Sequence, residues 1–179
     1  TGARVLDKAG RVIYCGTFSK TLAPVLRLGF AVVPKPLVPA FVRLRTLMDR
    51  GAEGLGQATL TAFMRQGLLA THIRRVRTEY ARRRTALLDA MARHVSLVTP
   101  LAAPGGLHMV ARLPDGADET AAVLAARQRG LSVAPLHAYY LGPPRMAGLV
   151  MGFACTPEAL AADTAKRLEA ALRTARKDV

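Results

Sequence analysis

The residues of this chain best suited to chemistry lie in one short segment around Lys20. Thr17 and Ser19 come three and one residues before this lysine, and Arg27 follows it by seven. A lysine amine condenses with an aldehyde when neighbouring groups keep part of it neutral. Hydroxyls and a guanidinium bind a phosphate through charge-assisted hydrogen bonds. The segment therefore predicts a site for a cofactor with an aldehyde and a phosphate, attached at Lys20.

Two apolar runs flank this segment and must position it. Residues 11–15 form a short β-favouring run, residues 16–26 a polar loop, and residues 28–33 a second, continuous apolar run. The pattern predicts a strand, a loop that carries Lys20, and a second strand. Because the second run has no polar alternation, we expect that strand to be buried. Gly29 is expected to let it lie close to the loop.

The middle of the chain reads as helical. Prolines 34, 36 and 39 end the second strand, and apolar spacing predicts a helix through Met48 and another from about Gln57 to Arg65. A long amphipathic helix is then expected over residues 69–95. Its apolar stripe recurs at three-, four- or seven-residue spacing and comprises Leu69, Ile73, Val76, Tyr80, Leu87, Met91 and Val95.

The last part of the chain alternates short strands with two helices. Strands are predicted near residue 97 and at 107–113, 131–134 and 149–154. Asp118 is expected to cap a helix that runs to Arg129, and Thr156 with Pro157 to open a terminal helix. This order predicts a compact α/β or α+β lobe. We therefore divide the chain into residues 1–68, a joining helix at 69–95 and a C-terminal lobe at 96–179.

Composition points to a globular protein. The chain has 179 residues, of which 51% are hydrophobic, and no apolar run approaches the roughly 18–20 residues that span a bilayer. We expect a cytoplasmic protein with no membrane segment and no metal site. Cys15 and Cys155 lie in apolar contexts and are expected to be buried thiols. The chain lacks an initial methionine and reaches its reactive segment early, so we expect it to be the C-terminal part of a longer protein.

The formal charge of +14 comes mainly from arginines that are densest at residues 74–77 and 82–84. A basic surface attracts nucleic acids or anionic small molecules. No aromatic interleaving, zinc-finger spacing or helix-turn-helix pattern accompanies these arginines. A solvated helix face is therefore favoured over direct contact with DNA.

The segment Gly16-Thr-Phe-Ser-Lys-Thr-Leu-Ala-Pro-Val-Leu-Arg-Leu-Gly29 resembles the lysine segment of fold-type I pyridoxal-phosphate enzymes. More narrowly, it resembles the aminotransferase-like domain of MocR-type regulators of the GntR family. The resemblance continues through residues 70–87, which are similar to that family's long interdomain helix. It also includes residues 106–114 and 148–154, which are similar to strands of its C-terminal lobe. It covers essentially this whole chain but less than half of such a protein.

The resemblance implies an α/β fold in which the end of the large, cofactor-binding domain is joined by the long helix to a small domain. It implies pyridoxal 5'-phosphate bound as a Schiff base on Lys20. Thr17 and Arg27 would bind its phosphate, and Ser19 would support them. It further implies a homodimer with an amino-acid, amine or vitamin B6-type ligand. DNA contact would fall to an N-terminal winged-helix domain that precedes residue 1.

The resemblance leaves open whether the chain is catalytic. In an aminotransferase the same lysine moves a proton, whereas in a regulator the chemistry stops at ligand recognition. Relatives with transaminase activity carry a carboxylate-binding arginine where this chain has Val150. Arg112 and Arg145 are the candidate replacements, although surface or edge charges are expected of both.

The leading interpretation is a partial cofactor-binding domain of a MocR-type regulator. The first alternative is a fragment of a class I/II aminotransferase that moves an amino group between an amino acid and a 2-oxo acid. The second is a non-catalytic domain whose charge engages nucleic acid. His72, His108 and His137 are possible acid–base groups, and a structural role is expected for each.

Overall fold

The computed structural model describes residues 7, 9–50, 54–101 and 105–177. It divides the chain into two compact units, Thr1–Val76 and Arg77–Val179. The first residues of the predicted segment 1–68 and the last residues of the predicted segment 96–179 lie outside the described residues. No helix among the described residues is long and apolar enough to cross a membrane.

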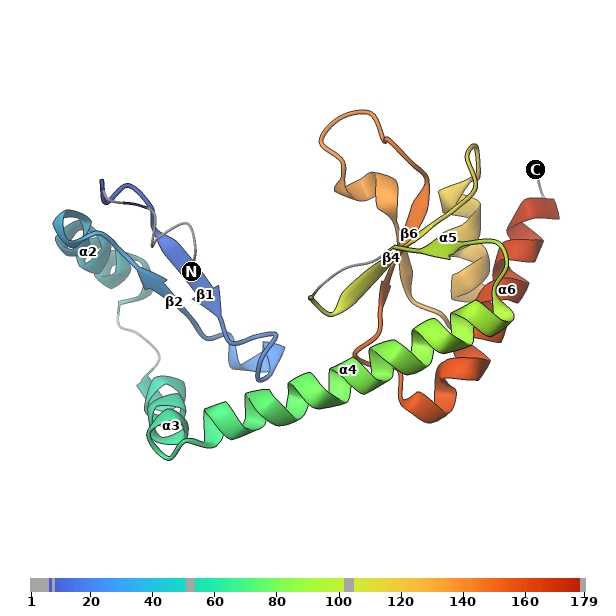
Figure 1. Cartoon of the computed structure of the whole chain (residues 1–179). Coiled ribbons are helices and arrows are strands. Elements are labelled where there is room, and N and C mark those ends of the chain that lie inside the picture. The colour runs from blue at the N-terminus through green and yellow to red at the C-terminus, as the bar shows by residue number, and fades with distance from the viewer. Residues whose placement is uncertain (1–6, 8, 51–53, 102–104, 178–179) are drawn as a thin grey trace. The chain divides into compact units, whose positions relative to one another are not determined.

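The first unit begins with an antiparallel pair of strands, β1 (Tyr14–Thr17) and β2 (Gly29–Val32). The register pairs Tyr14 with Val32 and Thr17 with Gly29, and a loop joins the two strands (Figure 1). The strand expected at residues 11–15 thus starts and ends later, whereas β2 falls within its expected range. Two short 3₁₀ turns, η1 (Pro24–Leu26) and η2 (Lys35–Leu37), follow β1 and β2 respectively.

The helices of this unit follow the apolar spacing. α2 (Val38–Asp49) has Pro39 in its first turn. α3 (Gly54–Arg65) starts three residues before the expected Gln57. Within β2, α2 and α3 the structure buries no side chain. The expectation of a buried second strand is therefore wrong for this chain, because its hairpin of two strands is not covered on both faces by described residues.

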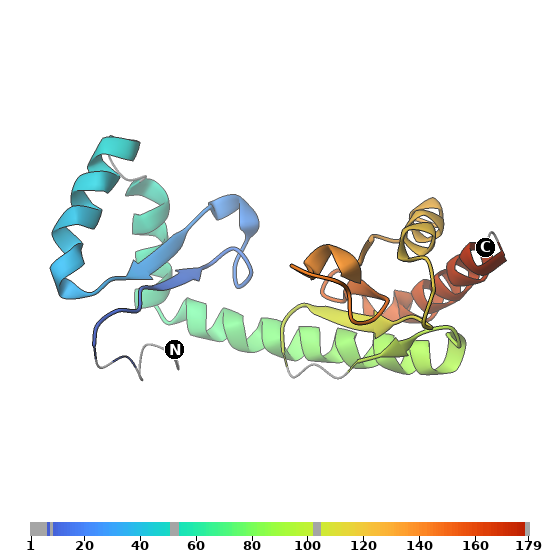
Figure 2. The same cartoon turned by 90° about the horizontal axis from the view of Figure 1, so that it is seen from above.

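The longest element is α4 (Leu68–His94), a helix of 27 residues. Its bounds lie within one residue of the expected 69–95, because the apolar stripe fixes a 3.6-residue period over many turns. Gly67, at φ +73°, precedes it, and Arg93 and His94 suit the negative end of the helix dipole. Figures 1 and 2 draw α4 as one uninterrupted helix. Its first residues belong to the first unit and the rest to the second.

The second unit contains a four-stranded antiparallel sheet in the order β3-β4-β6-β5. The helices α5 (Glu119–Gln128) and α6 (Ala161–Lys177) pack on one another. The strands are β3 (Thr99–Pro100), β4 (His108–Arg112), β5 (Val133–Pro135) and β6 (Gly148–Gly152), and the 3₁₀ turns are η3 (Leu136–Tyr139) and η4 (Glu158–Leu160). The predicted order of strands and helices is confirmed. The strand boundaries are shifted by up to three residues, and α6 begins four residues after the expected Pro157.

Of the two predicted helix N-caps, the structure confirms the one at Asp118 but not the one at Thr156. The Asp118 carboxylate accepts hydrogen bonds from the N–H groups of Thr120 at 2.7 Å and Ala121 at 3.0 Å, so the expected cap of α5 is confirmed. The expected cap at Thr156 is wrong. Pro157 instead precedes the 3₁₀ turn η4, without a side-chain cap, and α6 follows that turn.

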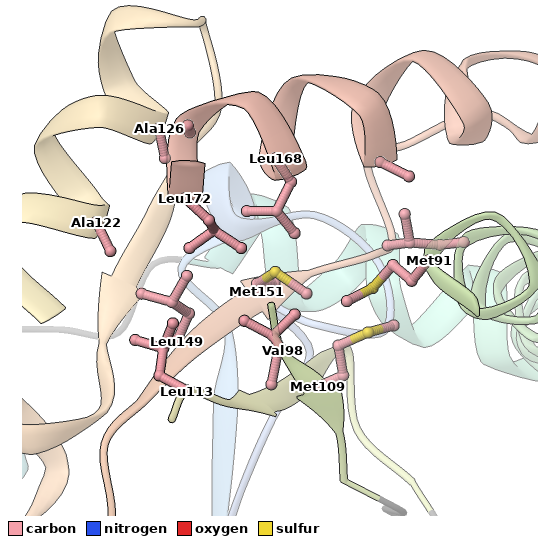
Figure 3. Close-up of a cluster of buried hydrophobic side chains, with 14 of the residues drawn as sticks. Met91, Val98, Met109, Leu113, Ala122, Ala126, Leu149, Met151, Leu168 and Leu172 are labelled. Atoms are coloured by element: carbon pink, nitrogen blue, oxygen red, sulfur yellow. The ribbon is translucent and has the colours of Figure 1, made fainter. Parts of the chain in front are cut away.

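The core of the second unit lies between the sheet and its helices. Leu149 and Met151 of β6 are buried together with Met109 of β4, and Leu168 and Leu172 of α6 point toward them (Figure 3). Met91 of α4 adds a third side to this cluster. Fully burying one such side chain contributes about 1.5–3 kcal/mol, so this core accounts for the compactness of the unit.

The two cysteines do not belong to this core. Cys15 on β1 and Cys155 in the turn after β6 are both exposed, so the prediction of buried thiols is wrong. Cys15 lies on a hairpin that the described part of the chain does not cover on both faces, and Cys155 falls beyond the end of its predicted strand.

Candidate functional site

Lys20 lies in the loop between β1 and β2, and main-chain hydrogen bonds close that loop. The N–H of Phe18 donates to the carbonyl of Leu28 at 3.0 Å, which extends the hairpin by one more pair. The N–H groups of Thr21 and Leu22 donate to the carbonyl of Phe18 at 3.2 and 2.8 Å, which forms a tight turn around Lys20. The Lys20 side chain is exposed. The amine is therefore accessible on an ordered turn.

The two predicted hydroxyls lie next to one another at the start of this loop. The Thr17 hydroxyl lies 3.0 Å from the Ser19 hydroxyl and accepts the Ser19 N–H at 3.1 Å. This is the local pattern by which a threonine side chain fixes the two residues that follow it. The hydroxyl pair precedes Lys20 directly, so the structure brings three of the four predicted residues together in one turn.

Arg27 closes the other side of the same loop. It ends η1 and adopts a left-handed backbone, at φ 49°, with its N–H donating to the carbonyl of Pro24 at 3.3 Å. A non-glycine residue costs about 1–2 kcal/mol in this conformation, and such residues concentrate at functional sites. The guanidinium is exposed. Arg27 therefore remains a candidate anion-binding group of the Lys20 loop.

Glycines allow the base of the loop to close tightly. A Cβ on Gly29 would lie 2.8 Å from the carbonyl oxygen of Gly16, which confirms the expected close approach. A Cβ on Gly16 would lie 2.4 Å from the ring of Phe30. That ring also packs against Phe18, with ring centroids 5.6 Å apart. A side chain at Gly29 would therefore push the two strands apart, whereas one at Gly16 would displace the Phe30 ring.

A helix residue far along the chain contacts the same loop. The imidazole Nε2 of His72, in the first turns of α4, lies 2.9 Å from the carbonyl oxygen of Thr21, the residue after Lys20. The Phe63 ring of α3 meets the His72 ring edge-on, with centroids 6.5 Å apart. Sequence reasoning gave His72 a structural role but did not find this contact. No local pattern connects residues 51 positions apart.

The remaining candidates belong to the second unit. Val150 lies between the buried residues Leu149 and Met151 on β6, so it faces the other side of the sheet. Arg112 pairs with Asp115 at 3.0 Å at the protein surface, as an edge charge would. His108 begins β4 and is exposed. Arg145 lines a hollow of about 560 Å³ together with His137.

A buried carboxylate in this unit was missed from the sequence. Glu119, only 6% exposed, accepts hydrogen bonds from the N–H groups of His137 at 2.9 Å and Gly148 at 2.6 Å. It also lies 2.7 Å from Nδ1 of the His137 ring. Because the sequence shows Glu119 only as an acidic residue in the first turn of a helix, its role in tying η3 and β6 to α5 was not foreseeable. The contact gives His137 the structural role that was expected.

Part of the basic surface of α4 is paired within the protein. Arg82 and Arg83 donate hydrogen bonds to Glu79 at 2.8 and 2.9 Å, and these bonds hold the pKa of that carboxylate below its ordinary value. Arg83 also donates to the carbonyl of Ala154. Within the described residues no cluster of three or more metal-ligating side chains occurs.

Comparison with known proteins gives this fold its class. The family model "Aminotransferase class I and II" matches residues 3–168. The chain therefore belongs to the class I and II aminotransferase family, which confirms the resemblance stated above.

Two of the relatives that the chain resembles are regulatory proteins. The chain is 37% identical over 150 residues to the probable rhizopine catabolism regulatory protein MocR of Rhizobium meliloti, covering 83% of this chain and 30% of that protein. It is 31% identical over 135 residues to the HTH-type transcriptional regulator TauR of Rhodobacter capsulatus, covering 75% and 28%. The chain thus spans less than a third of the length of these two relatives.

A solved structure matches over nearly the whole chain. The α-aminoadipate aminotransferase LysN of Thermus thermophilus, complexed with N-(5'-phosphopyridoxyl)-L-leucine, superposes with a TM-score of 0.83 at 26% identity. The match covers 94% of this chain and 43% of that enzyme. The fold is therefore that of fold-type I aminotransferases.

Proposed function

We propose that this chain is part of the pyridoxal 5'-phosphate-binding domain of a MocR-type transcriptional regulator, with Lys20 as the attachment point. The single observation that carries the proposal is the Lys20 loop. It carries an amine, two hydroxyls and a guanidinium on one loop between two paired strands, within a chain of the aminotransferase family. The chemistry of this donor set matches the aldehyde and the phosphate of that cofactor.

Each residue of the loop would have a different role in binding the cofactor. The exposed Lys20 amine would form the covalent link, since nothing in the loop seals it from solvent. Thr17 and Arg27 would donate to the phosphate, and Ser19 would hold the Thr17 hydroxyl in place. When bound, the cofactor supplies an electrophilic carbon for amines and a ring that withdraws electrons. Lys20 is also the group that would carry a proton to or from a bound amine.

The exposed apolar surface of the first unit supports a larger assembly. Leu47, Met48 and Leu55 are 70%, 80% and 79% exposed, and many neighbouring apolar side chains of this unit are exposed as well. Soluble proteins rarely leave so many large apolar side chains of one unit uncovered. We propose that residues 1–68 are the end of a large domain whose remainder covers this surface, and that the protein is a homodimer.

The same proposal assigns the other segments. Residues 69–95 would be the helix that joins the two domains, and residues 96–179 the C-terminal small domain. DNA contact would belong to a winged-helix domain elsewhere in the longer protein, and the protein would act in the cytoplasm. The ligand would be an amino acid, an amine or a vitamin B6-type compound, because each can be recognised by the Lys20 site with its cofactor.

A regulator is favoured over a working aminotransferase by two observations. Both relatives described above carry regulator names, and Val150 supplies no charge to bind a substrate carboxylate. The alternative function remains amino-group transfer between an amino acid and a 2-oxo acid. The likeness to LysN favours that alternative at the level of fold.

The experiment that separates these functions combines a spectrum with product analysis. The protein is titrated with pyridoxal 5'-phosphate, then with a panel of amino acids and amines, while visible absorbance is followed and 2-oxo acid is measured. We expect saturable cofactor binding and spectral changes with selected amines, with no repeated turnover to 2-oxo acid. Repeated turnover would establish the aminotransferase function, and a complete lack of cofactor binding would refute both.

A further inference from the structure

We propose that His72 is a positioning residue for the Lys20 amine, acting through the main-chain carbonyl of Thr21. The inference rests on the proposed role of Lys20 and extends it to a residue of α4. The contact joins a helix to the reactive loop across 51 residues of sequence.

The hydrogen bond has a defined direction. A carbonyl oxygen can only accept, so the His72 Nε2 that lies 2.9 Å from the Thr21 oxygen must carry the hydrogen. In the neutral ring this fixes the tautomer and leaves Nδ1 without a proton. The edge-on Phe63 ring packs against the imidazole and limits its rotation. The donor is thus held from both α3 and α4.

The bond completes the restraint of the backbone after Lys20. The peptide group that follows Lys20 is held through the Thr21 N–H, which donates to the carbonyl of Phe18 at 3.2 Å. The next peptide group is held at its nitrogen, where Leu22 donates to the same carbonyl at 2.8 Å, and at its oxygen, where His72 donates. Without His72, that second group is anchored on one side only. The loop would then sample more orientations of Lys20, and fewer of them would place its amine at a bound carbonyl.

The test uses three variants of the protein. His72→Leu removes the donor, and His72→Gln keeps an N–H group at a similar distance from the main chain. His94→Leu is the control, because His94 lies at the other end of the same helix. Thermal unfolding first establishes that each variant is folded. Hydrogen exchange without cofactor is then measured for the amides of Thr21 and Leu22.

We expect His72→Leu to speed exchange at these amides about three- to tenfold, as expected for the loss of one hydrogen bond, with His72→Gln and His94→Leu close to the wild type. The second readout compares two aldehydes trapped on Lys20 by reduction and located by peptide mass. Trapping of pyridoxal 5'-phosphate should fall about tenfold in His72→Leu, whereas trapping of formaldehyde, which needs no alignment, should be unchanged.

Equal exchange rates in His72→Leu and the wild type would overturn the proposal. So would a parallel loss of both aldehydes, because that result would indicate general disruption rather than positioning. If the wild type traps formaldehyde but never pyridoxal 5'-phosphate on Lys20, the proposed function fails instead. The exchange rates would still decide whether His72 holds the loop.

Discussion

A Cβ placed on Gly29 would lie 2.8 Å from the main-chain carbonyl oxygen of Gly16, across the base of the Lys20 loop. Real Cβ atoms do not approach a backbone atom so closely, so a side chain at Gly29 must move one strand. We predict that Gly29→Ala lowers the affinity for pyridoxal 5'-phosphate about tenfold and destabilises the protein by about 1–3 kcal/mol. Cofactor titration and urea unfolding measure the two effects. Gly54→Ala is the control, because a Cβ there meets no atom within 4 Å.

Arg27 is predicted to recognise the phosphate of the cofactor. Arg27→Ala should weaken pyridoxal 5'-phosphate binding about tenfold to a hundredfold, because a charge-assisted hydrogen bond contributes about 1.5–3 kcal/mol. Binding of pyridoxal, which lacks the phosphate, should be nearly unchanged. Arg50→Ala is a matched control, since Arg50 is also exposed and also has a left-handed backbone, at φ 51°. An equal loss for both aldehydes in Arg27→Ala would contradict phosphate recognition.

Glu119 is predicted to be the most costly carboxylate to remove from the second unit. Glu119→Ala leaves the N–H groups of His137 and Gly148 without their acceptor, so the free energy of unfolding should fall by about 2–4 kcal/mol. Glu119→Gln keeps one acceptor and should cost less. Glu158, 49% exposed, provides the control, and Glu158→Ala should change stability by less than about 1 kcal/mol. Chemical unfolding at neutral pH measures all three.

Glu169 is predicted to make stability depend on acid pH. Burial opposes ionisation of this group, but hydrogen bonds from the N–H and hydroxyl of Ser96 and from Arg173 hold its pKa below the ordinary value. The unfolded chain therefore binds this proton more tightly than the folded chain. The stabilisation is present above the ordinary carboxyl pKa of about 4.3 and is lost as the pH falls through the lowered pKa.

The variant Glu169→Gln should accordingly be less stable than the wild type at pH 7, by about 1–2 kcal/mol, and the difference should shrink in acid. Urea unfolding at neutral and acid pH measures this. Asp163→Asn, which alters an ion pair between the exposed Asp163 and the half-buried Arg167, should show little change at either pH. A pH-independent difference for Glu169→Gln would show that the lost contacts, rather than the charge, matter.

Local periodicity and local capping chemistry were sufficient to predict much of the fold. The bounds of α4 followed from its apolar stripe, and the start of α5 followed from Asp118, because these signals depend on neighbours within a few turns. The burial of β2 and of Cys15 was not predicted correctly. The burial of a strand depends on which other elements pack against it, and the residues of the strand itself do not determine this.

The candidate site could be predicted from the sequence only in part, because some of its contacts join elements that are distant along the chain. The grouping of Lys20 with Thr17 and Ser19 followed from adjacency in the sequence. The contact of His72 with Thr21, and those of Glu119 with His137 and Gly148, connect residues that are distant along the chain. Each is a single polar contact between two elements, and a single contact produces no repeating pattern in the sequence from which it could be predicted.

The covalent capture of the cofactor tests the central claim most directly. The protein is incubated with pyridoxal 5'-phosphate, reduced with borohydride and digested, and the modified peptide is identified by mass spectrometry. The account predicts a single phosphopyridoxyl group on Lys20, formed at low cofactor concentration and lost in Lys20→Ala. Modification spread over exposed lysines such as Lys35, at a yield unaffected by Lys20→Ala, would contradict it.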